Sequence, residues 1–118
     1  MAENIIKVKS FNFAKRIVNL YNCLCNEKRE FVMSKQLLRS GTSIGANVFE
    51  SDRAVSKKDF INKIGIAQKE AEETLYWIEL LHETDYIADV EYGSIKNDCE
   101  ELIKILMAIS KTSTRNDC

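Results

Sequence analysis

Residues 36–50 read QLLRSGTSIGANVFE, and they combine the apolar spacing of a helix with a row of polar side chains. On a helix, side chains three and four positions apart share one face. The polar row consists of Gln36, Arg39, Ser40, Ser43, Asn47 and Glu50. Gly41, Gly45 and Ala46 add small side chains beside this row. We interpret the segment as a helix-packing and assembly surface that carries a buried polar network.

Two of the glycines of the chain, Gly41 and Gly45, fall inside this helical segment. Each costs about 1 kcal/mol relative to alanine in the interior of a helix. Glycine is useful at such a position where a neighbouring backbone or a large side chain approaches closely. We therefore expect another helix to pack tightly against this segment.

Length and composition are those of one soluble domain. A chain of 118 residues buries about two-thirds of its unfolded surface on folding. No segment approaches the roughly 20 consecutive apolar residues that a membrane span requires. Residues 1–9, MAENIIKVK, lack the apolar core and the cleavage site of a secretory signal. We expect a cytoplasmic protein that does not enter the membrane.

The whole chain has high helical potential, because it contains no proline and only four glycines. The predicted helices span about residues 10–27, 34–51, 56–83 and 89–111. Ser10 and Ser34 are the expected N-caps of the first two helices. Short connections favour antiparallel neighbours. The sequence thus predicts an all-α fold, an antiparallel up-down-up-down four-helix bundle in one domain of residues 1–118, with a frayed tail at 112–118.

Apolar side chains at three- and four-residue steps define the expected core. The first two helices contribute Phe13, Ala14, Ile17, Val18, Tyr21, Leu24, Cys25, Leu37, Leu38, Gly41, Ile44, Ala46 and Val48. The third contributes a heptad seam of Phe60, Ile64, Ala67, Ala71, Thr74, Ile78 and Leu81, and the fourth contributes Ile95, Cys99, Leu102, Leu106 and Ile109. Ser56 and Asp59 resemble a capping box at the start of the third helix.

The cysteines and the single histidine predict neither a metal site nor a cofactor. Cys23, Cys25, Cys99 and Cys118 form no CxxC pair, and His82 alone cannot complete the spacing of a zinc site. On a helix, Cys23 and Cys25 point about 200° apart. We expect reduced, mainly structural thiols, with Cys118 the most reactive of them.

Catalysis also lacks the residues that it needs. Glu79 and His82 form one Glu-x-x-His pair, whereas a di-iron bundle requires two such pairs. Gly41 and Gly45 lack the lysine and the spacing of a phosphate-binding loop. We therefore predict that the protein is not an enzyme and that His82 is solvated or hydrogen-bonded.

Charge is unevenly distributed along the chain. Residues 1–69 contain thirteen Lys and Arg against six Asp and Glu, whereas residues 70–118 contain four against twelve, so the two parts carry +7 and −8. One interpretation is complementary packing between adjacent helices or subunits. The other is a basic surface for nucleic acid.

Nine basic residues are candidates for contacts with RNA or DNA. They are Lys15, Arg16, Lys28, Arg29, Lys35, Arg53, Lys57, Lys58 and Lys63. These residues are dispersed over several segments with little aromatic interleaving, so one copy of the chain gives a weak signal. A symmetric oligomer repeats the same charges around an axis and strengthens their field.

Three residues of the third helix are candidates for contacts beyond it. Glu70 and Glu73 lie one helical step apart, so they suit partnership with Arg39 or Asn47 across the interface between the second and third helices. The alternatives for these carboxylates are a solvated face and a ligand site. Trp77 is a candidate subunit-interface residue, and its alternative is to fill the bundle.

A set of spaced motifs extends over nearly the whole chain. Gln36-x-x-Arg39-Ser40-x-x-Ser43-Ile44-x-x-Asn47-Val48-x-Glu50 is followed by Ser56-x-x-Asp59-Phe60 and by Ala67-x-x-Glu70-Ala71-x-Glu73-Thr74-x-Tyr76-Trp77. This set closely resembles the four-helix-bundle proteins encoded in intervening sequences of bacterial 23S ribosomal RNA genes. One departure is Ser51, where members of the family usually have a glycine that ends the second helix.

The resemblance implies an all-α bundle that assembles with itself as a ring, typically a homopentamer. It also implies a relationship to the accessory protein of diversity-generating retroelements, which binds nucleic acid and a reverse transcriptase. The family carries the name of a ribosomal protein, but this name does not correspond to a settled biochemical activity.

Three functional hypotheses follow from these observations. The first is a non-enzymatic, ring-forming bundle that serves as an accessory factor associated with nucleic acid. The second is an oligomeric scaffold that binds a partner protein and has no nucleic-acid role. The third is a small-molecule enzyme with a pocket lined by Arg39, Asn47 and Glu73.

Overall fold

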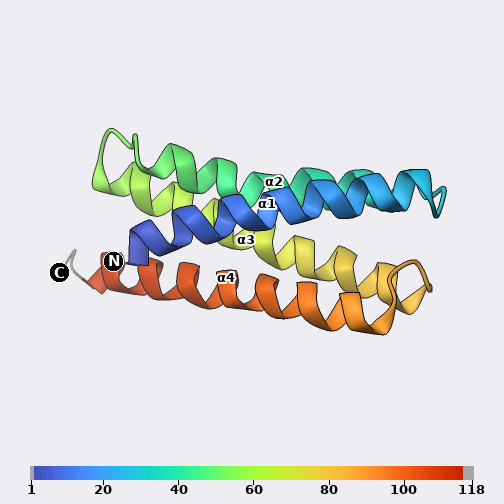
Figure 1. Ribbon diagram of the computed structural model, residues 1–118. Coiled ribbons are helices and arrows are strands. Elements are labelled where there is room, and N and C mark those ends of the chain that lie inside the picture. Colours follow the sequence, from blue (N-terminus) through green and yellow to red (C-terminus); the bar gives the residue numbers. More distant parts are fainter. Residues whose placement is uncertain (1, 116–118) are drawn as a thin grey trace.

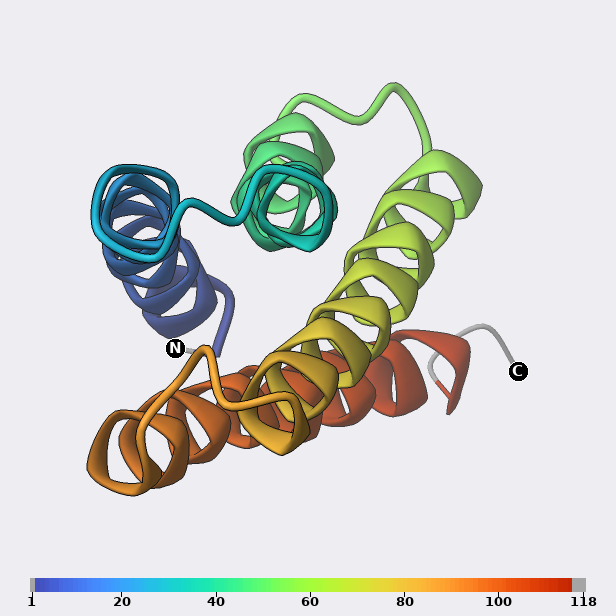
Figure 2. The same cartoon turned by 90° about the vertical axis from the view of Figure 1, so that its right-hand side faces the viewer.

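The computed structural model describes residues 2–115, and the regular structure in that range is helical. The helices are α1 (Ala2–Asn26), α2 (Met33–Ser51), α3 (Lys57–Glu83) and α4 (Asp89–Arg115). Each helix runs antiparallel to the next, and α1 also contacts α4, so the helices follow one another around the bundle in chain order (Figures 1 and 2). The predicted up-down-up-down four-helix bundle is confirmed.

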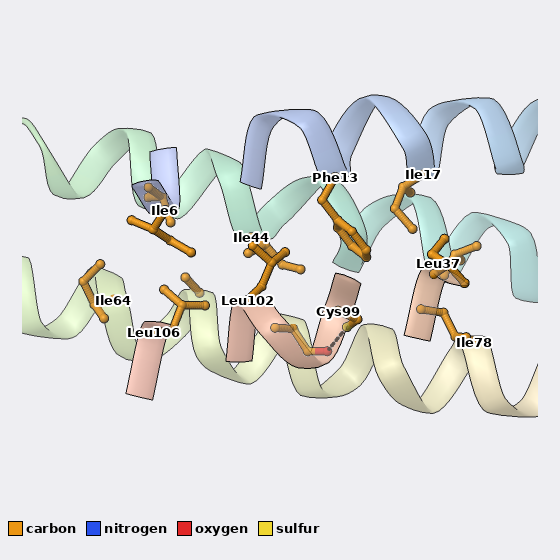
Figure 3. Packing of buried hydrophobic residues seen from close by; sticks show 14 of the residues in the cluster. Ile6, Phe13, Ile17, Leu37, Ile44, Ile64, Ile78, Cys99, Leu102 and Leu106 are labelled. Atoms are coloured by element: carbon orange, nitrogen blue, oxygen red, sulfur yellow. Dashed lines mark hydrogen bonds between the residues drawn. The ribbon is translucent and has the colours of Figure 1, made fainter. Parts of the chain in front are cut away.

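The core runs along the inside of all four helices. Figure 3 shows Phe13 and Ile17 of α1 close to Leu37 and Ile44 of α2. The seams predicted for the third and fourth helices are buried as expected, except that Phe60 is only half-buried. Val18 and Ala46 were predicted in the core, but both are exposed, because their positions face outward from α1 and α2.

α1 begins eight residues earlier than predicted, so the assignment of Ser10 as its N-cap is wrong. Ile6 and Ser10 are both buried at 1% exposure. They lie four residues apart and continue the inward face of Phe13 toward the N-terminus. The apolar stripe therefore carries the helix past Ser10. At the other end of the chain, α4 includes four residues of the predicted frayed tail, 112–115, and ends at Arg115.

α1 and α2 approach closely where the glycines of α2 lie. A Cβ atom on Gly41 would lie 2.8 Å from two side-chain carbons of Ile17, which is fully buried. A Cβ atom on Gly45 would lie 3.2 Å from the carbonyl oxygen of Ser10. The expected close approach of a neighbouring helix is confirmed, and the neighbour is α1.

Glu30, and not Ser34, caps the start of α2. The Glu30 carboxylate accepts hydrogen bonds from the backbone N–H groups of Val32, Met33 and Ser34 at 2.7–3.1 Å. Burial raises the pKa of Glu30, but these donors outweigh burial, and the net shift is downward. Ser34 lies inside the first turn, and its hydroxyl donates to the Glu30 carbonyl oxygen. The predicted cap is wrong because α2 begins at Met33, so Ser34 already lies inside the helix.

The boundary between α2 and α3 uses serine side chains. α2 ends at Ser51, whose buried hydroxyl donates to the Val48 carbonyl oxygen, and the next residue keeps a right-handed helical conformation. No left-handed glycine is therefore needed at this exit. Ser56 accepts a hydrogen bond from the Asp59 N–H, as the capping box predicted. The Asp59 carboxylate reaches the N–H of Val55, one residue before the cap.

We expect Gly41→Ala to lower the free energy of unfolding by about 1–3 kcal/mol, because the new methyl group overpacks the contact with Ile17. Chemical denaturation followed by circular dichroism measures the change. Gly65→Ala is the matched control, since no atom within 4 Å opposes its methyl group. That control should gain up to about 1 kcal/mol from helix propensity. Equal effects of the two substitutions would contradict the close approach.

Candidate functional site

The polar row of residues 36–50 divides between the core and the surface. Ser40 is fully buried, and its hydroxyl lies 2.9 Å from the hydroxyl of buried Thr74 on α3. Arg39 is adjacent in sequence and therefore turned by about 100°. Its side chain is 48% exposed. Only the pair of Ser40 and Thr74 thus forms the buried polar contact that we expected of the whole row.

Arg39 bridges α2 to α3 at the surface of the bundle. Its guanidinium donates to the Glu70 carboxylate at 3.2 Å and also to the Glu73 carboxylate. Of the two partners considered for these carboxylates, Arg39 contacts both, whereas Asn47 contacts neither. The hydrogen bond with Glu73 raises the pKa of Arg39, so the guanidinium remains charged. The arrangement connects two helices by charge-assisted hydrogen bonds.

Trp77 joins this cluster through its indole N–H, which donates to the Glu73 carboxylate at 3.2 Å. This hydrogen bond is the main cause that holds the pKa of Glu73 below its ordinary value, and Arg39 adds to the effect. Trp77 is half-buried against the core. The aromatic side chain that faces solvent is its neighbour Tyr76, which is 58% exposed.

The other residues of the row make local contacts. Gln36 accepts a hydrogen bond from Arg39, and the Ser43 hydroxyl donates to the Arg39 carbonyl oxygen. The Asn47 amide donates to the Ser43 carbonyl oxygen of its own helix, so it does not bridge to α3. Glu50 pairs with Lys63 of α3 at 2.8 Å. The expected buried network is therefore a surface cluster, which we call the Arg39 cluster: Gln36, Arg39, Glu70, Glu73 and Trp77.

The nine basic candidates do not form one surface. Arg16 pairs with Glu91 and Asp98 of α4 at 3.0 and 2.7 Å, so its charge is used in pairing α1 with α4. Lys63 is neutralised by Glu50 in the same way. The other candidates lie on α1 or at the two ends of the bundle: Lys15 on α1, Lys28, Arg29 and Lys35 around the first connection, and Arg53, Lys57 and Lys58 around the second.

His82 and Cys99, two of the groups that a metal or a nucleophilic reaction would use, are held in structural contacts. Within residues 2–115, no three His, Cys, Asp or Glu side chains gather closely enough to hold a metal ion. His82 stacks on Tyr92 and contacts Asp89 through Nε2 at 2.8 Å. The Cys99 thiol donates to the Ala71 carbonyl oxygen (Figure 3), and burial raises its pKa to about 12. Cys118 lies outside the described residues.

Sequence reasoning missed a set of exposed aromatic side chains. Phe11 and Phe49 are 65% and 58% exposed on neighbouring helices, and Phe31 is exposed in the first connection. Phe11 and Phe49 fall one position away from the buried stripes of α1 and α2. A helical-wheel projection of α1 that starts at Ala2 includes Val8 and would have placed Val8, Phe11 and Val18 together on the outward face.

Among the helices described between residues 2 and 115, none has the length and the apolar character needed to cross a membrane. The protein is a four-helix bundle in which the Arg39 cluster connects α2 to α3 by hydrogen bonds. Residues 2–108 match the family described as 23S rRNA-intervening sequence protein, and the chain belongs to this family.

The chain is also similar to a solved structure from Bacteroides thetaiotaomicron. That crystal structure is of a protein with unknown function from the S23 ribosomal protein family. The two sequences are 59% identical, and the TM-score is 0.93 over 94% of this chain and 99% of the other. Comparison with functionally curated proteins gave no match.

Because Trp77 is the single tryptophan of the chain, its fluorescence reports on Glu73. We expect the emission to change as pH falls, with a midpoint below the value of about 4.3 for an ordinary glutamate. The lowered pKa means that the contribution of Glu73 to stability is present above its unfolded pKa and is lost as pH falls through the folded one.

Glu73→Gln should abolish this fluorescence transition and cost less than about 1 kcal/mol, since Arg39 and Glu73 are 48% and 39% exposed. Glu72→Gln, on the adjacent position of α3, is the control and should keep the transition. An unchanged midpoint in Glu73→Gln would show that another group is titrating near the indole.

Proposed function

We propose that the protein is a cytoplasmic, non-enzymatic assembly protein that forms a ring of identical copies and acts as an accessory factor for nucleic acid. Five copies is the number that the family resemblance implies. The observation that most supports assembly is the exposure of Phe11 and Phe49 on neighbouring helices. Exposed apolar patches on a soluble protein mark interaction surfaces.

The Arg39 cluster supports assembly over catalysis. The residues of the enzyme hypothesis are Arg39, Asn47 and Glu73. Arg39 and Glu73 satisfy each other, and the Asn47 amide donates to its own helix. Because Arg39 and Glu73 are partly exposed, they lie in a high-dielectric environment, where a carboxylate gains little reactivity. The cluster instead fixes the relative position of α2 and α3.

The nucleic-acid role rests on the basic residues at the first connection. Lys28, Arg29 and Lys35 are exposed around Phe31, and the Arg29 guanidinium lies 5.3 Å from the centre of the Phe31 ring. The buried Glu30 carboxylate holds the backbone of this connection. Cations beside an exposed aromatic ring suit a single-stranded nucleic acid, which offers phosphates and unstacked bases. A ring repeats the set once for every copy.

The assembly claim predicts a solution mass that is a fixed multiple of the 13.5 kDa chain mass. Native mass spectrometry and light scattering at micromolar concentration measure it, and five copies is the expected number. A monomer under these conditions would overturn the proposed ring.

The nucleic-acid claim predicts RNA or DNA binding that weakens steeply with salt, because phosphate contacts release counterions. Lys28→Glu with Lys35→Glu should weaken binding and lower the salt slope by about 0.7 for each lost contact to a single strand. Lys104→Glu with Lys111→Glu, on α4, is the control with the same change of charge. Absence of binding at low salt would favour the second hypothesis, a protein-binding scaffold with no nucleic-acid role.

A further inference from the structure

A shallow apolar groove runs between the outer faces of α1 and α2. Its volume is about 350 Å³, and it is lined by Phe11, Ala14, Thr42, Gly45, Ala46, Phe49 and Glu50. We call these residues the α1–α2 groove. Its aromatic residues are Phe11 and Phe49, and Ala14, Gly45 and Ala46 are small. Gly45 approaches the Ser10 carbonyl oxygen closely, and it places no side chain in the groove.

The groove continues along α1 as an exposed apolar stripe. Val8, Phe11 and Val18 are 61%, 65% and 40% exposed, and they recur at helical steps on the outward face. Each such side chain costs roughly 25 cal/mol per Å² of apolar surface left in water. A partner that covers the stripe and the groove together would recover this energy. The surface is therefore suited to receive a ridge of another helix.

Two cations flank the aromatic residues of the groove, whereas Glu50, the carboxylate in its lining, is paired with Lys63. The Lys15 ammonium lies 5.4 Å from the centre of the Phe11 ring, and the Arg53 guanidinium lies 4.3 Å from the centre of the Phe49 ring. Two copies that met groove to groove would bring these cations together, which like-charge repulsion opposes. A partner surface that fits the groove must therefore be apolar at its centre and acidic at its edges.

The chain has such a surface on α3. Tyr76 is 58% exposed, and its helical neighbours at three- and four-residue steps include Glu72, Glu73 and Glu79. We call these four residues the Tyr76 ridge. Trp77 supports the Tyr76 ring edge-on, with ring centres 5.0 Å apart and planes at 77°. Trp77 in turn donates a hydrogen bond to Glu73, so the exposed Tyr76 ring packs against a residue of the Arg39 cluster.

We propose that the α1–α2 groove of one copy receives the Tyr76 ridge of the next copy. This inference rests on the proposed ring and names the surfaces that form it. The ring edge of Tyr76 enters between Phe11 and Phe49, and the glutamates lie toward Lys15 and Arg53.

The position of these surfaces determines the type of assembly. α1 and α3 lie diagonally across the bundle, and their backbones are not neighbours (Figure 2). The groove and the ridge therefore face different directions, and one copy uses both at once. Such a head-to-tail contact closes into a ring when its rotation allows, and it does not stop at a two-fold dimer.

Two single substitutions and their mixture test this contact. Phe49→Glu places a carboxylate in the groove, and Tyr76→Lys places an ammonium on the ridge. Each variant alone should lose the wild-type mass and sediment near 13.5 kDa. Mixed in equal amounts, they should form complexes that contain both chains, because the intact groove of one variant meets the intact ridge of the other.

Phe31→Glu is the control, since Phe31 is also exposed but lies in the first connection. It should keep the wild-type mass. Circular dichroism checks that each variant is folded. Arg53→Glu, which reverses the exposed charge beside Phe49, provides a second variant that should also lose the wild-type mass.

The outcomes separate this inference from the proposed function. A monomeric wild-type protein would overturn the ring itself. A wild-type oligomer whose mass survives Phe49→Glu and Tyr76→Lys would overturn only the assigned surfaces. If Phe49→Glu is monomeric while Tyr76→Lys keeps the wild-type mass, the groove pairs with another surface, and the proposed contact is wrong.

Discussion

The close contact between Gly41 of α2 and Ile17 of α1 is the constraint on which the other features depend. It allows the two helix backbones to approach while Ile17 remains fully buried. A second glycine, Gly45, repeats the approach near Ser10 and leaves small side chains on the outer side of the helix pair. The same packing that closes the core therefore also creates the hollow between Phe11 and Phe49. Core packing and the candidate assembly surface share one cause.

Ion pairs join the helices at two other seams. Arg16 of α1 pairs with Glu91 and Asp98 of α4, and Arg39 of α2 pairs with Glu70 and Glu73 of α3. In both cases a basic residue from the first part of the chain meets carboxylates from the second part. The uneven charge of the sequence is thus partly used in helix pairing. The charges left at the surface remain available for contacts between copies or with nucleic acid.

Periodicity predicted the bundle and most of its interior, because burial on a helix repeats at three- and four-residue steps. The seam of α3 followed this rule from Ile64 to Leu81. The start of α1 was missed because a serine in a buried stripe resembles an N-cap. The cap of α2 was missed because Glu30 acts through backbone N–H groups that come together only in the folded connection.

For the Arg39 cluster, spacing indicated that Glu70 and Glu73 face Arg39 or Asn47, and the structure selects Arg39. The predicted burial was wrong, because spacing alone does not distinguish the inner side of a helix interface from its outer edge. That distinction depends on how the two helices are rotated, which Gly41 and Ser40 decide by occupying the inward positions. The exposed aromatic side chains depend on the same rotation, and the late start predicted for the first helix left Val8 out of the outward stripe that contains Phe11.

Hydroxyl-radical footprinting of the assembled protein tests the central claim most directly, because it reports the solvent access of individual aromatic side chains. The account predicts that Phe11, Phe49 and Tyr76 are protected from oxidation, although each is more than half exposed in a single copy. Phe31, in the first connection, should react in proportion to its exposure. Oxidation of all four side chains in proportion to their exposure in one copy would contradict the account.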